Sequence, residues 1–226
     1  MQAVNARIER AARAAGRDPG AVRLLAVSKT HPAALVDEAY QAGQLAFGEN
    51  YVQEALRKMD ALGQLPLEWH LIGPLQSNKA GAAAERVAWV HTVESEGIAR
   101  RLSARRPETL PPLNVLVPVN VSGEKTKSGV APQQLPALAH AVAALPRLRL
   151  RGLMAIPEPT PDFARQRACF RAARELFERL VADGLALDTL SLGMSADLEA
   201  AIAEGSTLVR VGTAIFGARE SARNAA

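Results

Sequence analysis

Short apolar stretches alternate with longer amphipathic stretches along the whole chain. The first apolar stretch, residues 22–30 (VRLLAVSKT), has five Val, Leu or Ala residues in nine and delivers a lysine at its end. A strand covered on both faces, as in a parallel sheet, has this composition. Seven later stretches also predict strands, at residues 45–50, 67–73, 88–93, 111–121, 148–154, 189–193 and 207–211.

Between these strands, apolar residues recur at the spacing of an α-helix, and turn residues separate the segments. Gly16 and Gly43 end two of the predicted helices, and Ser95 caps the start of another. The predicted helices and helix-like connections span residues 2–15, 32–43, 51–62, 76–85, 95–105, 132–145, 161–183, 196–204 and 215–222.

Eight strands, each followed by a helix or a helix-like connection, predict an α/β fold: a single (β/α)8 TIM barrel forming one domain over residues 1–226. The chain has no long linker and no sequence repeat. An open doubly wound sheet is the alternative fold. Such a sheet more often carries a glycine fingerprint after its first strand, and none follows this strand.

The longest predicted helix, residues 161–183, carries an apolar stripe that we expect to face the core. The stripe consists of Phe163, Phe170, Ala173, Phe177 and Leu180. The arginines of the same helix, at positions 165, 167, 171, 174 and 179, are expected to form a solvated face. An RNA-binding face is the alternative interpretation of these arginines.

Composition and charge exclude several classes of protein. The 27 Lys and Arg against 23 Asp and Glu leave a net charge of +4, which does not demand nucleic acid. The single cysteine, Cys169, allows no internal disulfide and no thiolate metal cluster, and we expect a packed thiol rather than a nucleophile. No apolar run approaches the roughly 18–20 residues that span a bilayer. The first residues lack the apolar core of a signal peptide, so a cytoplasmic protein is expected.

The chemistry of a barrel belongs at the C-terminal ends of its strands. Polar residues and glycines concentrate at these predicted ends: Lys29, Glu49, Asn50, His70, Gly73, Asn120, Met154, Ser195, Gly212 and Thr213. Loops after the last two strands of a barrel recurrently bind phosphate, so Ser195, Gly212 and Thr213 are predicted to hold an anion. The alternative is that Ser195 only caps a helix and Gly212 only turns the chain.

A strand-end lysine together with a phosphate site suggests a phosphorylated aldehyde held by Lys29 as a Schiff base. Taken alone, Lys29 could equally be a solvent-exposed loop residue. Arg210 lies two residues before Gly212, so its side chain shares a face of the strand with that glycine and could point at the same ligand.

Other chemistries have weaker support in the sequence. His70 is expected to be a core histidine with a satisfied hydrogen bond. No GxSxG elbow is present, which argues against a hydrolase triad. Four scattered histidines and one cysteine argue against a zinc site.

Several motifs, in order and over nearly the whole chain, resemble those of the pyridoxal phosphate homeostasis protein family. They are AVSKT (26–30), FGENYVQE (47–54), WHLIGPLQSNK (69–79), NVSGEKTKSG (120–129), GLMAIP (152–157) and GMSADLEAAIAEGSTLVRVGTAIFGAR (193–219). The resemblance implies one barrel like the N-terminal domain of alanine racemase. One departure, Ala83 where an aliphatic residue is usual, leaves the predicted site untouched.

The resemblance also implies roles for individual residues toward pyridoxal 5′-phosphate (PLP). Lys29 matches the lysine that forms an internal aldimine, and Arg210 matches an arginine facing the pyridine nitrogen. Asn50 matches a polar residue beside the ring, and Lys127 matches a second lysine proposed to take part in cofactor handover. The positions that hold the phosphate are matched by Ser195, Gly212 and Thr213.

The function that follows is a carrier and buffer of PLP that passes the cofactor to apoenzymes and has no robust catalysis of its own. A pyridine ring whose nitrogen faces an arginine is a poorer electron sink than a ring whose nitrogen faces a carboxylate. Racemases with such an arginine add a second base, a tyrosine from another domain, and this chain has only Tyr40 and Tyr51. A PLP-dependent racemase or decarboxylase and an RNA-associated protein are the alternatives. We expect a monomer with no metal and no membrane contact.

Overall fold

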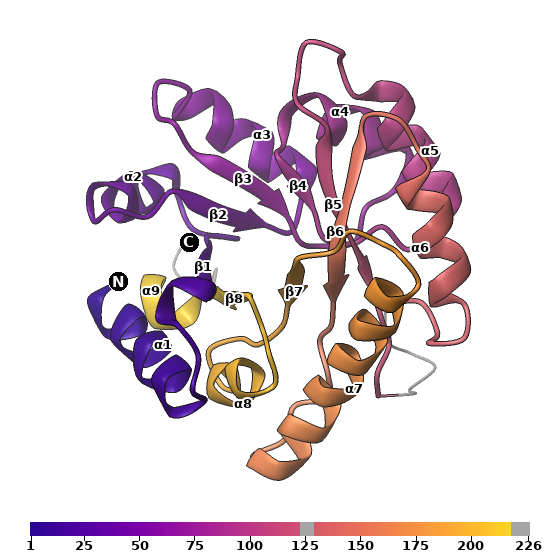
Figure 1. The fold of residues 1–226 in the computed structure, drawn as a ribbon. Helices are drawn as coiled ribbons and strands as arrows, with labels where there is room; N and C mark the ends of the chain where they lie inside the picture. The colour runs from indigo at the N-terminus through magenta and orange to yellow at the C-terminus, as the bar shows by residue number, and fades with distance from the viewer. Residues whose placement is uncertain (123–128, 218–226) are drawn as a thin grey trace, which may run out of the picture.

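Eight parallel strands form a closed barrel in the computed structural model, which describes residues 1–122 and 129–217 (Figure 1). The strands follow one another around the barrel in chain order, and β1 pairs with both β2 and β8. The predicted (β/α)8 barrel is therefore confirmed, and the alternative prediction of an open doubly wound sheet is wrong. The strands are β1 (Arg23–Val27), β2 (Ala46–Glu49), β3 (Glu68–Leu71), β4 (Trp89–Val90), β5 (Leu113–Pro118), β6 (Leu148–Met154), β7 (Thr189–Ser191) and β8 (Leu208–Val211).

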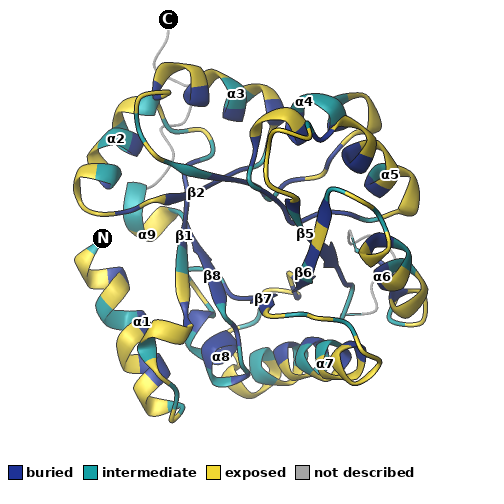
Figure 2. Cartoon of the chain, turned by 45° about the horizontal axis from the view of Figure 1, so that its top comes forward, coloured by how far each residue is buried: buried dark blue, intermediate teal, exposed yellow. Residues whose placement is uncertain are grey.

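Helices surround the barrel, with their buried residues facing the strands and their exposed residues on the outer surface (Figure 2). In the described parts of the chain, no helix is both long and apolar enough to traverse a lipid bilayer. The helices are α1 (Gln2–Ala14), α2 (Ala33–Gln41), α3 (Val52–Ala61), α4 (Ala80–Arg86), α5 (Glu96–Arg105), α6 (Leu135–Ala143), α7 (Phe163–Ala182), α8 (Leu198–Ala203) and α9 (Thr213–Phe216), with short 3₁₀ helices η1 (Pro19–Ala21) and η2 (Ser77–Lys79).

Side-chain alternation along the strands separates two apolar layers. Leu25 of β1 packs with Ala46 and Leu208, whereas its neighbour Ala26 belongs to the large core between strands and helices. A period of two along a strand places Leu25 on the barrel axis and Ala26 against the helices. Residues two positions further along β1 therefore share the axial face.

Two predicted boundaries were wrong at the C-terminal rim of the barrel. The last helix, expected at residues 215–222, begins earlier, at Thr213, and α9 ends at Phe216, while residues 218–222 lie outside the described part of the chain. The helix expected at 196–204 begins at Leu198, because Asp197 and not Ser195 occupies its N-cap position. As a result, Thr213 lies in the first turn of α9, and Ser195 lies in the loop before α8.

The apolar stripe of α7 is only partly the predicted one. Phe170, Ala173 and Leu180 are buried as expected, Leu176 joins them, and Phe177 is partly buried against the core. Phe163, however, is 51% exposed. The 20 residues of α7 extend for about 30 Å, whereas the 7 residues of the preceding strand β6 extend for only about 23 Å. The first turn of the helix therefore projects past the sheet.

The arginines of α7 are also not simply a solvated face. Arg167, Arg171 and Arg174 form ion pairs with Glu204, whose side chain is almost fully buried between α7 and α8. The shortest pair joins Arg167 Nε to Glu204 Oε1 at 2.7 Å. These contacts attach α7 to the segment that leads into β8.

The contrast between Phe163 and Phe170 can be tested by truncation. Phe170→Ala removes a fully buried ring and is expected to lower the free energy of unfolding by about 3–5 kcal/mol. Phe163→Ala, the matched control, is expected to change it by less than about 1 kcal/mol, because much of that ring already contacts water. Urea denaturation measures both values, and equal losses would contradict the assignment of the core.

Candidate functional site

A cavity of about 370 Å³ lies at the C-terminal ends of the strands. Its size suits a small organic ligand. Apolar side chains of Ile72, Met154, Ile156 and Met194 supply part of the wall. All six residues predicted to bind the cofactor line this one cavity: Lys29, Asn50, Ser195, Arg210, Gly212 and Thr213.

Strand geometry places Lys29 and the Gly212–Thr213 turn on neighbouring parts of the rim. β1 and β8 are hydrogen-bonded neighbours, with Leu25 opposite Arg210. Val27 and Lys29 follow Leu25 at intervals of two, which carries them along the axial face to the cavity. Lys29 therefore reaches the cavity from β1 while Arg210 and Gly212 reach it from β8.

Two glycines allow close backbone packing at the rim. A Cβ on Gly212 would lie 3.0 Å from the carbonyl oxygen of Val27, so a larger residue would push β8 away from the end of β1. A Cβ on Gly73 would lie only 2.2 Å from the carbonyl oxygen of Asn50. Gly73 thus packs directly against the backbone that carries the predicted polar residue Asn50.

The loop that carries Ser195 is held from two sides. The Asp197 carboxylate accepts a hydrogen bond from the Met194 N–H at 2.6 Å, and burial raises the pKa of this carboxyl group. Arg7 of α1 donates to the Ser195 carbonyl oxygen at 3.2 Å and to both carboxylate oxygens of Glu199 at 2.9 Å. These contacts leave the Ser195 side chain on the cavity wall without a capping role.

Arg210 is the buried cation of the site, with only 4% of its surface exposed. Its Nη1 donates to the carbonyl oxygen of Ser191 at 2.5 Å and to the Ser191 hydroxyl at 2.6 Å. Its Nη2 donates to the Ala155 carbonyl oxygen at 3.0 Å. Burial lowers the pKa of Arg210 to about 10, so the guanidinium stays charged at neutral pH.

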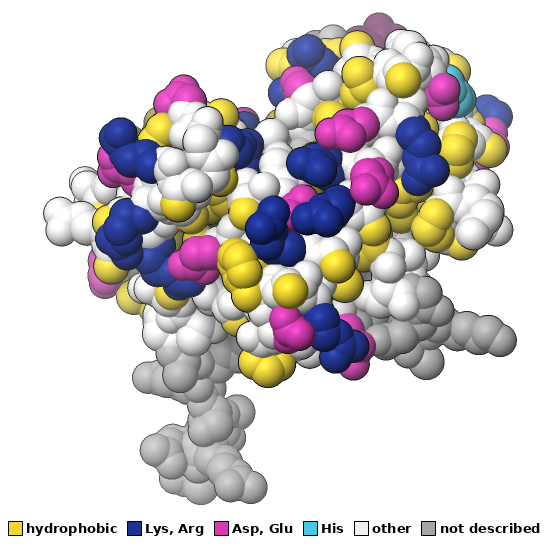
Figure 3. All heavy atoms as spheres, turned by 60° about the horizontal axis from the view of Figure 1, so that its bottom comes forward, with side chains coloured by type: hydrophobic (Ala, Val, Ile, Leu, Met, Phe, Trp, Pro, Cys, Tyr) yellow, Lys and Arg dark blue, Asp and Glu magenta, His cyan; other side chains and the backbone are white. Residues whose placement is uncertain are grey.

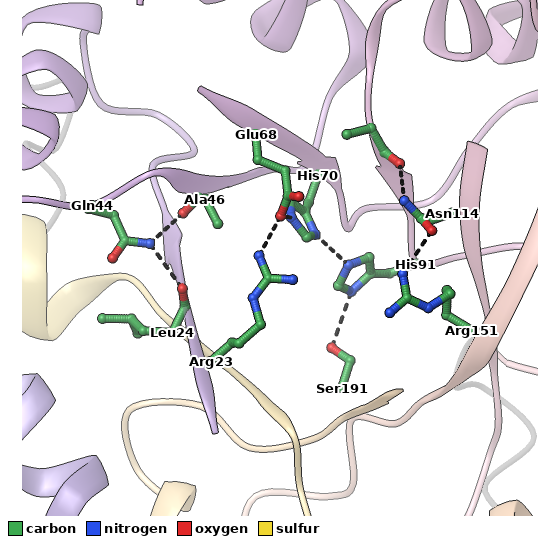
Figure 4. A network of polar contacts seen from close by, with 11 residues as sticks. Arg23, Leu24, Gln44, Ala46, Glu68, His70, His91, Asn114, Arg151 and Ser191 are labelled. Carbon is green, nitrogen blue, oxygen red and sulfur yellow. Dashed lines mark hydrogen bonds and ion pairs between the residues drawn. The ribbon is translucent and has the colours of Figure 1, made fainter. Parts of the chain in front are cut away.

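Beyond Ser191, which is a partner of Arg210, a chain of hydrogen bonds continues through the interior of the barrel, and Figure 4 shows it from Ser191 to Arg23. Ser191 Oγ lies 3.1 Å from His91 Nδ1, and His91 Nε2 lies 2.9 Å from His70 Nδ1. His70 Nε2 lies 2.8 Å from Glu68 Oε1, which also accepts from Arg23 at 2.6 Å. The network therefore links the cavity to the opposite end of β3 and β1.

With both imidazoles neutral, donor and acceptor chemistry gives this network one direction. Arginine can only donate, so the Ser191 hydroxyl accepts from Arg210 and gives its own proton to His91 Nδ1. His91 then donates through Nε2 to His70 Nδ1, and His70 donates through Nε2 to the carboxylate of Glu68. In this direction each neutral imidazole carries its proton on Nε2.

The electrostatics agree with two neutral histidines. Burial lowers the pKa of His70, although its hydrogen bond to Glu68 opposes the shift. Burial lowers the pKa of His91 well below its ordinary value, and the positive charge of Arg210 adds to this shift. The hydrogen bond from His70, together with Arg23, holds the pKa of Glu68 down at about 2.

Several predicted strand-end residues lie away from the cavity. His70 is a buried core histidine with two hydrogen bonds, as expected, but it lies in the middle of the barrel. Glu49 points toward α3, where its carboxylate pairs with Lys58 at 2.6 Å. Asn120 follows β5 and is not among the described residues that line the cavity. The predicted second lysine, Lys127, lies outside the described residues.

Sequence reasoning missed the residues that support the site from behind. Ser191, His91 and Arg7 contact cavity residues or their partners, and none stood out as functional. His91 and Ser191 are polar residues within otherwise apolar predicted strands, and this pattern could have indicated that each needs a buried hydrogen-bond partner. No local pattern could reveal that Arg7 reaches a loop 188 residues later in the chain.

Chemically, the arrangement combines an amine, a buried cation and hydroxyl donors around apolar walls. Ser195 and Thr213 offer hydroxyls, and the first N–H groups of α9 have no acceptor within their own helix. Lys29 and Arg210 offer nitrogen donors on β1 and β8. A flat ligand with an anionic group and an electrophilic carbon would match these groups.

Comparison with known proteins finds full-length relatives. The family model of the alanine racemase N-terminal domain matches residues 1–220. The chain is 64% identical over 217 residues to a pyridoxal phosphate homeostasis protein of Pseudomonas aeruginosa, covering 96% of this chain and 93% of the relative. It is 55% identical over 223 residues to the protein of the same name from Escherichia coli K12, covering 96% and 94%.

Solved structures agree with these matches. PipY of Synechococcus elongatus, solved with PLP bound, is 42% identical with a TM-score of 0.82, covering 93% of this chain and 99% of PipY. An alanine racemase from Corynebacterium glutamicum has a TM-score of 0.70 at 19% identity, covering 96% of this chain and 60% of the racemase. The likeness to the racemase concerns the fold alone.

The two buried histidines predict how stability depends on pH. Their folded-state pKa values lie below the ordinary 6.5, so below that pH the unfolded chain binds more protons than the folded one. The free energy of unfolding is therefore expected to fall as the pH drops from 7 to 5. His91→Gln removes one titrating group and should make this decline shallower, by up to about 1.4 kcal/mol per pH unit.

The matched control is His140→Gln, which removes an exposed imidazole of α6 outside the network. Urea denaturation at a series of pH values measures the slope for wild type and both variants. A His91→Gln slope equal to that of wild type would contradict the neutral, buried state of this imidazole.

Proposed function

The chain belongs to the pyridoxal phosphate homeostasis protein family, and on this premise we propose that it binds PLP at the barrel mouth and acts as a carrier and buffer of the cofactor. The observation that carries the proposal is the convergence of six predicted residues, from the ends of β1, β2, β7 and β8, on one cavity. The names of the relatives and the PLP-bound PipY structure support the choice of ligand.

The donor set fits the chemistry of PLP. Ser195, Thr213 and the close backbone at Gly212 suit the phosphate, because hydroxyls and N–H groups donate to its oxygens. Arg210 suits the ring nitrogen, and Asn50 a polar substituent of the ring. Ile72 and Met154 offer apolar contacts to the ring faces.

Lys29 supplies the covalent attachment in this proposal. Its neutral amine adds to the aldehyde carbon, both N–H protons leave with the carbonyl oxygen as water, and a C=N bond replaces the C=O bond. When bound, PLP supplies an electrophilic aldehyde and a ring that can accept electrons. The phosphate donors at β7 and β8 hold the ligand while this bond forms or breaks.

The residues around the ring favour storage over catalysis. Ser191 and Ala155 hold the Arg210 guanidinium in place. Because this group only donates hydrogen bonds, a ring nitrogen facing it accepts a hydrogen bond and carries no proton of its own. A ring without that proton withdraws electrons weakly. Neither of the two tyrosines, Tyr40 and Tyr51, is among the described residues lining the cavity, so neither supplies a second base there.

The proposal has three further parts. The chain forms a single domain over residues 1–226, it acts as a monomer in the cytoplasm, and it hands PLP over to apoenzymes. Lys127 remains a predicted second lysine for handover. Basic and acidic side chains are interspersed on the face of the molecule shown in Figure 3, and the α7 arginines pair with Glu204. This mixed charge favours a small-molecule carrier over an RNA-associated protein.

Covalent trapping tests the role of Lys29. Wild-type protein mixed with PLP is expected to be yellow, and borohydride reduction should label the peptide that contains Lys29. Lys29→Ala should lose the absorbance and the label while keeping affinity for pyridoxine 5′-phosphate, which has an alcohol in place of the aldehyde. An unchanged absorbance in Lys29→Ala would refute the assignment.

Exchange of the α-hydrogen separates a carrier from a racemase. The PLP-loaded protein is expected to exchange the α-hydrogen of L-amino acids with deuterated water no faster than free PLP does, because no tyrosine is among the described residues that line the cavity. Proton NMR of each amino acid measures the rate. Rapid exchange with any one amino acid, lost in Lys29→Ala, would favour the racemase or decarboxylase.

A further inference from the structure

The backbone beside Lys29 has an unusual conformation. Thr30 has φ of +67°, and only one other non-glycine residue of the described chain has a positive φ. β-Branched residues rarely adopt this left-handed conformation, because the Cβ crowds the backbone. Such conformations persist only where surrounding contacts hold them.

Contacts from α3 hold both sides of Lys29. The carboxylate of Glu54 accepts a hydrogen bond from the Thr30 N–H at 2.6 Å. The ammonium group of Lys58 donates to the Ser28 carbonyl oxygen at 2.7 Å. The residues immediately before and after Lys29 are therefore both bound to the same face of one helix.

The three charged groups behind the loop, Glu49, Glu54 and Lys58, form one connected cluster. Lys58 donates its three N–H groups to Ser28 O at 2.7 Å, Glu49 Oε1 at 2.6 Å and Glu54 Oε1 at 2.8 Å. Its side chain is only 7% exposed. The Ser28 hydroxyl completes the cluster by donating to Glu49 Oε1 at 2.6 Å.

We propose that Glu54 and Lys58 are positioning residues that fix the backbone on both sides of Lys29 and thereby set where its amine lies in the cavity. The inference rests on the proposed function, in which Lys29 bonds to the aldehyde. Neither residue lines the cavity, so neither touches the ligand. They act through Lys29, by limiting the directions its side chain can take.

The contacts distinguish this role from simple attachment of α3 to the barrel. An ion pair between Glu49 and Lys58 would suffice to join β2 and α3. Instead, Lys58 and Glu54 also form hydrogen bonds with the backbone on the two sides of Lys29, at Ser28 and Thr30. The strained Thr30 is the residue that Glu54 contacts.

Glu54→Ala and Lys58→Met test the proposal, and Glu54→Gln is the conservative variant. Glu54 Oε1 alone accepts from both Thr30 and Lys58, so the amide oxygen of glutamine can replace it. Glu204→Ala and Arg106→Met are matched controls, because they remove a buried carboxylate and a buried backbone-binding cation away from the cavity.

Two measurements separate positioning from folding. The first is the rate at which PLP labels Lys29, read by borohydride quenching at timed intervals and peptide mass. The second is the Kd of pyridoxine 5′-phosphate, which occupies the cavity without forming the bond. Thermal unfolding of each variant identifies any that does not fold.

Glu54→Ala and Lys58→Met are expected to slow labelling by about tenfold or more, since a small misplacement of a reacting group costs that much. Their Kd for pyridoxine 5′-phosphate should stay within about threefold of the wild-type value. Glu54→Gln and both controls should label at close to the wild-type rate. If Lys58→Met does not fold, Glu54→Ala decides, because it leaves Lys58 paired with Glu49.

Labelling of Glu54→Ala at the wild-type rate would overturn the inference. So would an equal loss of labelling rate and of pyridoxine 5′-phosphate affinity, or the same slow labelling in Glu204→Ala. A wild-type protein that is not labelled at Lys29 would instead refute the proposed function, and this inference with it.

Discussion

The guanidinium of Arg210, buried near the axis of a closed barrel, is the constraint on which the rest of the site depends. A buried charge is tolerated only when its donors are satisfied. Ser191 of β7 and the Ala155 carbonyl oxygen, just after β6, accept three hydrogen bonds from this group. Ser191 in turn contacts His91, and the hydrogen bonds continue through His70 to Glu68. One cation at the cavity is therefore connected to polar groups along the length of the barrel.

The site is held from two independent directions. Arg210 is supported from within the barrel by the Ser191–His91–His70 chain, which ends on the pair of Glu68 and Arg23. The backbone on both sides of Lys29 is bound from outside the barrel by Glu54 and Lys58. Arg210 lies on β8 and Lys29 just beyond the end of the neighbouring strand β1, and the contacts around them belong to different networks.

Most of the cavity could be predicted because its residues follow strands that pattern alone reveals. Lys29, Ser195 and Gly212 each follow an apolar run, and the barrel brings the ends of all such runs together. Arg210 could be added because side chains alternate along a strand. The exposed Phe163 could not be foreseen, because helical periodicity does not tell how far α7 extends past its strand.

By itself, the sequence determined the number and order of strands and helices, and hence the barrel and the residues at its mouth, because these follow from local periodicity. Only the tertiary structure decided the partners of those residues. His91 meets Ser191 across 100 positions, and Lys58 meets Ser28 across 30. No local pattern encodes such pairs, because they exist only once barrel closure has put distant strands side by side and burial has obliged each polar group to find a partner.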